Sequence, residues 1–421
     1  MSVLGQQLIS RFCLKNIKNL VPCVVTCKFS ENVAEKKHVS NSSNAIPDPI
    51  PGMIQTAILK KYSSPLVIEN IEPVNNIKSN EVLIDVSYCA CNGPDVLLSE
   101  NSYNSKLNPP FVLGYELVGK LLQVGAEAQA AGYKVNDKVV ALSKERFGGF
   151  SEQCVVEVGD IWRVPSSIKS IDAVSLMENY MTALIAFEQC GALEENDTAL
   201  INVGLRGAGL AAVDVATNVY RTKAIAVCAS EETANLVREE KGAFAAFKYS
   251  EKKLISQIKE IAKELNIHDI FEDNEGERFK NMLHCFTNIY KTKTLSKDML
   301  RDDNFATVVQ YLSREGKLVV AGVAETKGES QNDNKESGFS VTGINLREYR
   351  KNNHELYRQA GEEVLSHFEE GLIKPSYSLI VGLYKINEAM KSVTDTKSSG
   401  KVLIDLKDKN APLVRKKNDV Q

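Results

Sequence analysis

The chain has 421 residues, of which 43% are hydrophobic and 25% charged, a composition typical of a globular protein large enough for two domains. Its formal net charge of −3 provides no electrostatic basis for binding nucleic acid or an anionic membrane surface. No apolar run reaches the length of a transmembrane helix, so we expect no membrane insertion.

Nine cysteines and five histidines are scattered without the spacing of a disulfide framework or a metal site. The two closest cysteine pairs, Cys23/Cys27 and Cys89/Cys91, lack the second pair that a zinc site requires. We therefore expect reduced thiols and no bound metal.

The first 30 residues carry basic but no acidic side chains. In a helix that turns about 100° per residue, Arg11, Lys15 and Lys18 share one face, opposite the apolar residues Ile9, Phe12, Cys13, Ile17 and Leu20. This pattern is typical of a mitochondrial transit peptide, and an extension without a targeting role in a cytoplasmic protein is the alternative. Residues 1–52 are thus predicted to be a transit segment and linker, with folded structure from near Met53.

From residue 53 to 175 the sequence predicts short strands separated by glycine and proline. The clearest are Val82–Val86, Leu117–Leu122, Lys138–Leu142 and Cys154–Val158. This spacing favours a compact β-rich domain.

From residue 176 to 345 predicted strands alternate with predicted helices. The strands are Thr198–Val203, Lys223–Cys228, Ala246–Lys248, Asp269–Phe271 and Lys317–Ala321. Such alternation is typical of a doubly wound parallel sheet. Two polar segments, 283–304 and 325–339, are predicted to be solvated loops. A helix at Leu356–Glu370 and a strand at Lys401–Leu406 follow.

Residues 203–209 read Val-Gly-Leu-Arg-Gly-Ala-Gly, between a predicted strand and an alanine-rich predicted helix. In the dinucleotide-binding pattern G-x-G-x-x-G, the glycines make the tight turn, admit the pyrophosphate, and let helix and strand pack closely. Gly204 and Gly209 hold the first and third positions, and a helix beginning near Gly207 would direct its N–H groups at phosphate. A strand-to-helix turn that binds nothing is the alternative.

Arg206 stands where this pattern has its middle glycine. Its guanidinium can bind phosphate as a bidentate donor, or its side chain can fill the cleft and exclude a cofactor. The sequence leaves both possibilities open.

Ser230 follows the second strand of the predicted sheet, where NAD-binding enzymes place an acidic residue against the ribose 2′-hydroxyl. A serine leaves room for a 2′-phosphate, whereas Glu231 and Glu232 would repel one unless they point into the following helix. NADPH is therefore the predicted cofactor, with NADH possible.

Seven short motifs occur in one order along the chain. They lie at residues 89–95, 114–119, 148–152, 180–183, 203–209, 315–322 and 400–403. Together they resemble the zinc-free quinone oxidoreductases of the medium-chain dehydrogenase/reductase superfamily from about Met53 to Leu406, and most closely the quinone oxidoreductase-like proteins.

The resemblance implies a GroES-like catalytic domain over 53–175 and a Rossmann nucleotide-binding domain over 176–345. Residues 346–410 would return to the first domain, and 411–421 would form a charged tail. It also implies metal-free hydride transfer from NADPH to a quinone or an enone, because Tyr115 stands where zinc-dependent relatives need a histidine. A homodimer is implied as well.

By resemblance, Asn92 and Tyr103 are the catalytic candidates. Asn92 would hydrogen-bond the substrate or the nicotinamide carboxamide, and Tyr103 would orient the substrate carbonyl or relay a proton. Thr182 would hold the carboxamide, and Tyr249 would pack near the 2′-phosphate. The alternatives are a turn asparagine, a half-buried tyrosine, a threonine bonded to its own helix, and an exposed strand-end aromatic.

Several residues depart from the family pattern in addition to Arg206. Thr233 replaces a lysine, Leu97 replaces a tyrosine, and Asn136-Asp137 replaces Gly-Asp. Three functions follow as hypotheses: a reductase of quinones or enones, an enoyl-thioester reductase with a basic entrance, and a catalytically degenerate relative that serves as a nucleotide-binding or assembly module.

Overall fold

The computed structural model describes residues 46–103, 107–188, 193–204, 207–249, 254–265, 267, 269–272, 317–322, 339–393 and 400–415. The predicted basic helix of the N-terminus, Arg206 and the polar segments 283–304 and 325–338 lie outside these ranges. Phe339, at the end of the second polar segment, begins a strand rather than a loop.

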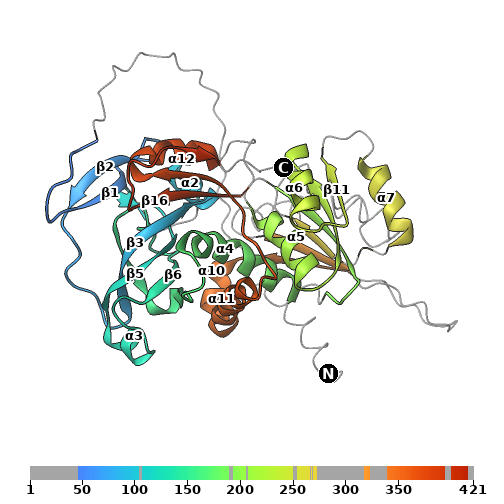
Figure 1. Ribbon diagram of the computed structural model, residues 1–421, viewed down its shortest axis with the longest axis horizontal. Coiled ribbons are helices and arrows are strands. Elements are labelled where there is room, and N and C mark those ends of the chain that lie inside the picture. The colour runs from blue at the N-terminus through green and yellow to red at the C-terminus, as the bar shows by residue number, and fades with distance from the viewer. Residues whose placement is uncertain are drawn as a thin grey trace, which may run out of the picture. The chain divides into compact units, whose positions relative to one another are not determined.

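The β-rich part of the chain contains two sheets (Figure 1). A three-stranded sheet has the order β2-β1-β4, formed by β1 (Ile54–Leu59), β2 (Val67–Ile71) and β4 (Phe111–Val112). The larger sheet has the order β17-β15-β16-β3-β5-β6-β8, and β7 also pairs with β3. Its first strands are β3 (Glu81–Cys91), β5 (Glu116–Val124), β6 (Lys138–Leu142), β7 (Gln153–Glu157) and β8 (Ile161–Arg163).

Strand β3 is the centre of the larger sheet because it pairs with three strands, β5, β7 and β16. Consecutive residues Val82, Leu83 and Ile84 are all buried, so both faces of the strand are covered. The four strands predicted here are confirmed as β3, β5, β6 and β7. Val158 falls outside β7 because a 3-10 turn, η1 (Val158–Asp160), follows that strand.

The second sheet has six strands in the order β11-β10-β9-β12-β13-β14. They are β9 (Thr198–Val203), β10 (Lys223–Cys228), β11 (Ala245–Lys248), β12 (Asp269–Glu272), β13 (Lys317–Gly322) and β14 (Phe339–Ile344). Strands β9 to β12 are parallel, as predicted, but β13 pairs antiparallel with both neighbours. The sheet is therefore Rossmann-like on one side of β12 and departs from the all-parallel expectation on the other.

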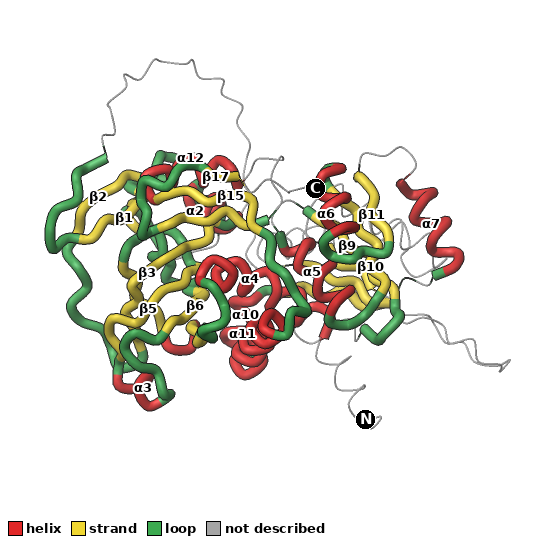
Figure 2. The backbone as a smooth tube through the Cα atoms, in the orientation of Figure 1, coloured by secondary structure: helices red, strands yellow, loops and turns green. Residues whose placement is uncertain are grey.

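Helix α4 (Ser170–Ala186) lies between the two sheets and is buried along most of its length (Figure 2). It packs against β3, β5 and β6 of the larger sheet, and against helix α5 (Ala208–Asn218) beside the second sheet. The remaining helices are α2 (Gly93–Ser99), α3 (Ala126–Ala130), α6 (Glu231–Glu239), α7 (Leu254–Glu264), α10 (Leu346–Asn352), α11 (His354–Glu369) and α12 (Ile386–Val393). None of the helices in the described ranges is both long and apolar enough to cross a bilayer.

The C-terminal strands complete the larger sheet. They are β15 (Tyr377–Gly382), β16 (Lys401–Asp405) and β17 (Val414–Arg415). Val402 of β16 lies opposite Cys91 of β3, which places Lys401 beside the start of α2. The predicted fold class, a β-rich part followed by a Rossmann-like sheet with helices, agrees with these two sheet systems, and the exact domain boundaries stay predictions.

A buried carboxylate on α5 joins several elements. Asp214 accepts hydrogen bonds from Tyr180 of α4 (2.6 Å), from the Lys241 ammonium (2.9 Å) and from the backbone N–H of Lys374 (2.8 Å). The side chains of Asp214 and Lys241 are 2% and 1% exposed, so each charge has its partner inside the protein. Helices α4 and α5 are thus fastened to the segment that leads back into β15.

Trp162 of β8 packs under helix α11. Its Nε1 donates a hydrogen bond to the carbonyl of Arg358 (2.9 Å), and its ring lies 5.3 Å from that of Tyr357 between centroids. Gly361 lies directly above the indole, because a Cβ at this position would lie only 2.2 Å from the Trp162 Nε1. The close approach of helix and strand therefore requires a residue without a side chain.

We expect Gly361→Ala to lower the free energy of unfolding by about 1–3 kcal/mol, since the new methyl group must displace the indole or the helix. Alanine ordinarily stabilises a helix interior relative to glycine, so a loss would report the clash itself. Urea unfolding followed by circular dichroism measures the change, with Glu362→Ala on the exposed face of α11 as control. An unchanged or higher stability of Gly361→Ala would contradict this packing.

Candidate functional site

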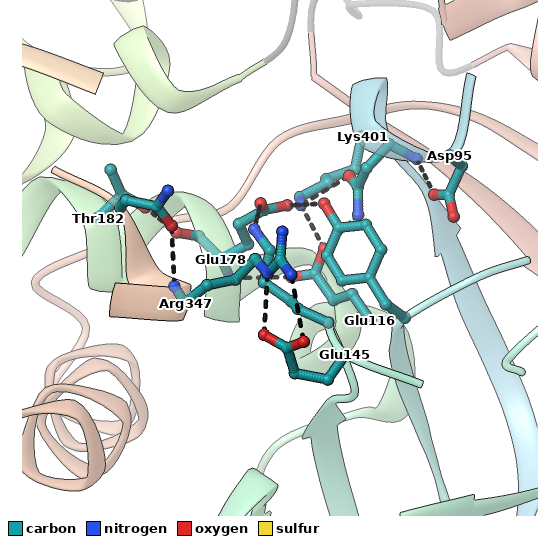
Figure 3. Close-up of polar contacts among 11 residues, drawn as sticks. Asp95, Glu116, Glu145, Glu178, Thr182, Arg347 and Lys401 are labelled. Carbon is teal, nitrogen blue, oxygen red and sulfur yellow. Dashed lines mark hydrogen bonds and ion pairs between the residues drawn. The ribbon is translucent and has the colours of Figure 1, made fainter. Parts of the chain in front are cut away.

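Asn92 lies at the N-terminus of α2, directly after the central strand β3. The residue is 7% exposed, and its side chain joins residues far apart in the sequence. Its Nδ2 donates to Glu116 Oε2 (2.8 Å) and its Oδ1 accepts from Lys401 Nζ (2.9 Å). Asn92 is therefore more than a turn residue, because its amide contacts Glu116 and Lys401 of a buried polar cluster, both of which are labelled in Figure 3.

Asp95 fixes the two backbone segments that carry this cluster. Its carboxylate accepts the backbone N–H of Asn92 (2.8 Å) and that of Gly114 (2.8 Å), which precedes β5. The side chain is fully buried, and this burial raises the pKa of Asp95 to about 7. The two N–H donors by themselves would lower this pKa, but burial has the larger effect. Asp95 thus ties the start of α2 to the turn that presents Tyr115 and Glu116.

Glu116 and Lys401 form a buried ion pair in the centre of the cluster. Their side chains are 0% and 1% exposed, and Lys401 Nζ donates directly to Glu116 Oε2. The second oxygen of Glu116 accepts the backbone N–H of Glu178 in α4 (3.0 Å). Both oxygens of the carboxylate are therefore used by the protein, as a buried charge requires.

A second ion pair, Lys144–Glu178, lies beside the first. Lys144 donates to Glu178 Oε1, and the Tyr115 hydroxyl donates to Glu178 Oε2. Burial by itself would raise the pKa of Glu178, but Lys144 and Lys401 outweigh it and lower the pKa to about 2. Burial would lower the pKa of Lys144, and Glu178 reverses that, so the pKa is raised. At neutral pH the cluster therefore contains an ionised carboxylate and a protonated amine.

Tyr103 lies at the edge of this cluster and is 8% exposed. Its ring makes an edge-to-face contact with the Phe147 ring, with 6.4 Å between the ring centroids. The Phe147 ring contacts the Tyr115 ring in the same way, with 5.4 Å between the centroids. The Arg347 guanidinium of α10 lies 5.6 Å from the Tyr103 ring centroid and forms a bidentate pair with Glu145 (2.9 and 3.1 Å). The structure thus connects Tyr103, through the Phe147 ring, to Tyr115 of the cluster.

Thr182 lies one turn after Glu178 in α4 and is 6% exposed. Its hydroxyl donates to the Glu178 carbonyl at 2.6 Å, which is the intrahelical bond that the sequence left as an alternative. The oxygen keeps lone pairs that can accept a hydrogen bond from a bound molecule.

The glycine turn reaches the same region from the second sheet. Gly207, at the start of α5, has φ +91°, and a Cβ there would lie 2.6 Å from Asn179 Nδ2 and 4.0 Å from the Gly400 Cα. A Cβ at Gly209 would lie 2.6 Å from the Asn202 carbonyl oxygen, so this glycine allows the helix to approach β9. Gly204 is buried directly after β9. Arg206 lies outside the described residues.

Ser230 follows β10, and Tyr249 directly follows the neighbouring strand β11. The Ser230 hydroxyl caps α6 by accepting the Thr233 N–H (3.1 Å), and it lies 2.9 Å from the Thr233 hydroxyl. Tyr249 is half-buried, and its N–H donates to the carbonyl of Cys228 (2.8 Å). The structure therefore groups these two residues together, apart from the cluster around Asn92.

Sequence reasoning missed most of the charged members of the cluster. Glu116 and Lys401 stand inside the motifs at residues 114–119 and 400–403, so the sequence contains a signal for these two residues. Glu178 and Lys144 gave no signal, because their contact joins a helix and a loop 34 residues apart. Within the described ranges, no group of three histidine, cysteine or acidic side chains is arranged to hold a metal ion.

Asp95 predicts a measurable pH dependence of stability. Its pKa is raised in the folded protein, so the stability it contributes is present below about pH 4 and is lost as pH rises through about 7. We expect wild type to have a higher Tm than Asp95→Asn at low pH, and we expect this difference to decline toward neutral pH. Thermal unfolding between pH 4 and 8 tests this, with Asp48→Asn at an exposed carboxylate as control. A difference independent of pH would contradict the raised pKa.

Comparison with known proteins shows which proteins this chain resembles. Residues 78–166 match the family model of the alcohol dehydrogenase GroES-like domain. Quinone oxidoreductase-like protein 2 of Mus musculus is 28% identical over 355 residues, which cover 84% of this chain and 92% of that protein.

Solved structures share the fold over a similar length. The NADPH complex of Escherichia coli quinone oxidoreductase has a TM-score of 0.61 at 17% identity, covering 84% of this chain and 99% of that one. The enoyl reductase CurK has a TM-score of 0.64 at 16% identity with the same coverage. The chain therefore contains an alcohol dehydrogenase GroES-like domain, and over most of its length it is similar to quinone oxidoreductase-like proteins and shares the fold of solved quinone oxidoreductases.

Proposed function

We propose that this protein is an oxidoreductase that uses a nicotinamide cofactor, preferably NADPH, to reduce quinones or activated alkenes by hydride transfer. One observation carries the proposal: the glycine turn at Gly207 meets α4 at Asn179, next to the buried cluster that holds Asn92. A nucleotide-binding turn and a set of polar side chains are thus adjacent, as hydride transfer requires.

The glycine turn fits a dinucleotide. Gly207 adopts a left-handed backbone conformation without a Cβ, and α5 begins directly after it. The N–H groups of the first turn of a helix have no partners within the helix and favour a phosphate group. The cofactor would supply the hydride, and the protein would hold it against the substrate.

Asn92, Tyr103 and Lys144 would act on the substrate. Reduction of a quinone or an enone places negative charge on an oxygen, and nearby donors stabilise that charge. The pKa of Lys144 is raised, so its amine stays protonated at neutral pH and keeps a positive charge beside the Tyr115 ring, 4.9 Å from the centroid. We propose that Asn92 and Tyr103 donate hydrogen bonds to this oxygen.

The cations of helix α10 favour an uncharged substrate over an acyl thioester on a phosphorylated carrier. Arg347 and Lys351 both pair with Glu145, and Arg350 pairs with Glu157 and Asp160. Because these cations are already neutralised by carboxylates, they do not form the basic entrance that such a carrier requires.

The preference for NADPH rests on the end of β10. Glu231 and Glu232 lie in the first turn of α6, and Glu231 pairs with Arg238 (3.0 Å), which reduces its repulsion of a 2′-phosphate. Ser230 and the half-buried Tyr249 leave no acidic side chain at the position that would select NADH.

The proposal predicts cofactor binding and turnover. We expect NADPH to bind more tightly than NADH when nicotinamide fluorescence is followed, and NADPH oxidation in the presence of a quinone or an α,β-unsaturated ketone. Asn92→Ala should lower kcat about tenfold to a hundredfold and change NADPH affinity little, because it removes a donor to the reacting oxygen. Asn218→Ala, at a half-buried amide on α5, is the control.

Other outcomes decide between the hypotheses. Binding without turnover of any quinone or enone favours a degenerate, nucleotide-binding relative. No binding of either cofactor at millimolar concentration contradicts the proposed function.

Arg206 provides a separate test of the glycine turn. We propose that its guanidinium binds the pyrophosphate, since it stands two residues after Gly204 and directly before Gly207. Arg206→Gly should then weaken NADPH binding about tenfold to a hundredfold, corresponding to a charge-assisted hydrogen bond of about 1.5–3 kcal/mol. Tighter binding in this variant would show instead that the arginine fills the place of the cofactor.

Two further expectations stay predictions. The homodimer rests on the family resemblance, and the mitochondrial location rests on the basic pattern of the first 30 residues.

A further inference from the structure

The ammonium group of Lys401 lies among oxygen atoms from three parts of the fold (Figure 3). Its Nζ donates to Glu116 Oε2 in β5 and to Asn92 Oδ1 at the start of α2 (2.9 Å), and it lies 3.9 Å from Glu178 Oε2 in α4. The lysine side chain itself is 1% exposed. Two carboxylates and one amide therefore surround a single buried positive charge.

These contacts determine how the Asn92 amide is turned. An ammonium group only donates, so the Asn92 oxygen must face Lys401, and a carboxylate only accepts, so the Asn92 nitrogen must face Glu116. Glu116 accepts one N–H of the amide, so an amide turned in this way has one further N–H to donate. The reverse orientation of the amide would place a donor against the ammonium and an acceptor against the carboxylate.

The packing leaves Glu116 dependent on this lysine. The other cation of the cluster, Lys144, pairs with Glu178 rather than with Glu116. Without Lys401, Glu116 would be a buried carboxylate without an adjacent cation, which is strongly unfavourable. Carboxylate and amide oxygens are also the ligands that hard divalent cations prefer.

We propose that Lys401 is a positioning residue whose ammonium serves as the built-in cation of an oxygen-lined site formed by Asn92, Glu116 and Glu178. It neutralises the site, keeps it from binding a divalent ion, and turns the Asn92 amide so that an N–H faces the bound molecule. The statement about the bound molecule rests on the proposed function, whereas the occupancy of the site by the ammonium does not.

Manganese binding tests the occupancy without any assay of activity. In Lys401→Ala the oxygens remain and the cation is gone, so we expect the purified full chain to bind about one Mn²⁺ at least tenfold more tightly than wild type. Loss of the free-ion electron paramagnetic resonance signal measures this. Lys401→Arg should restore the wild-type behaviour, and Lys401→Ala/Glu116→Gln should lose the added affinity. Equal Mn²⁺ binding by wild type and Lys401→Ala would overturn the proposal.

A thermal-unfolding cycle tests the same charge pairing in variants that do not depend on the folding of Lys401→Ala. Lys401→Met should lower Tm strongly, and Lys401→Met/Glu116→Gln should recover part of the loss, because the second substitution removes the unpaired charge. Folding of the double variant alone would support the same conclusion. A double variant as unstable as Lys401→Met, or unfolded as well, would show that the carbon chain of the lysine matters rather than its charge, and would overturn the proposal.

The two parts of the inference fail separately. If the Mn²⁺ and Tm results hold but NADPH does not bind to wild type, the built-in cation stands and the proposed function fails. If NADPH binds and is oxidised, but Lys401→Ala gains no Mn²⁺ affinity and Lys401→Met/Glu116→Gln recovers no Tm, the proposed function stands and the role of Lys401 fails.

Discussion

The Lys401–Glu116 ion pair is the interaction on which this part of the structure depends. It joins a strand near the C-terminus to a strand 285 residues earlier in the chain, in a place closed to solvent. Charges removed from water are tolerated only when each finds a partner with good geometry. The C-terminal strand β16 must therefore return to β3 in one register, with Val402 opposite Cys91, so that the amine meets the carboxylate. Backbone pairing and charge pairing thus specify the same arrangement.

Much of the fold could be predicted from local patterns. The strands at Lys138–Leu142, Thr198–Val203 and Lys223–Cys228 were predicted with the bounds that the structure shows, because each is an apolar run bounded by polar residues or turns. The antiparallel direction of β13 could not be predicted, since the apolar run Lys317–Ala321 fits a buried strand of either direction. The pattern of apolar residues indicates that a strand is buried, but it does not indicate whether the strand runs parallel or antiparallel to its neighbours.

The candidate site was predicted less completely than the fold. Asn92 and the glycine turn could be proposed as site residues because their motifs are local in sequence, and their roles stay predictions. In the structure, Gly207 lies beside Asn179 of α4, and Asn92 accepts a hydrogen bond from Lys401 of β16. The charged partners were missed because a lone lysine or glutamate is most often a solvated surface residue. Only the tertiary structure shows that Lys144 and Glu178 are largely buried together. The chemistry of the site therefore depends on pairs that have no signature in sequence.

The hydrogen bonds of Asp214 restrict which elements of the fold can move relative to one another. One of its oxygens accepts bonds from Tyr180, Lys241 and the backbone of Lys374. Separating these elements would leave a buried carboxylate without its donors, at a cost of several kcal/mol. Helices α4 and α5 and the start of the return segment should therefore move as one rigid body.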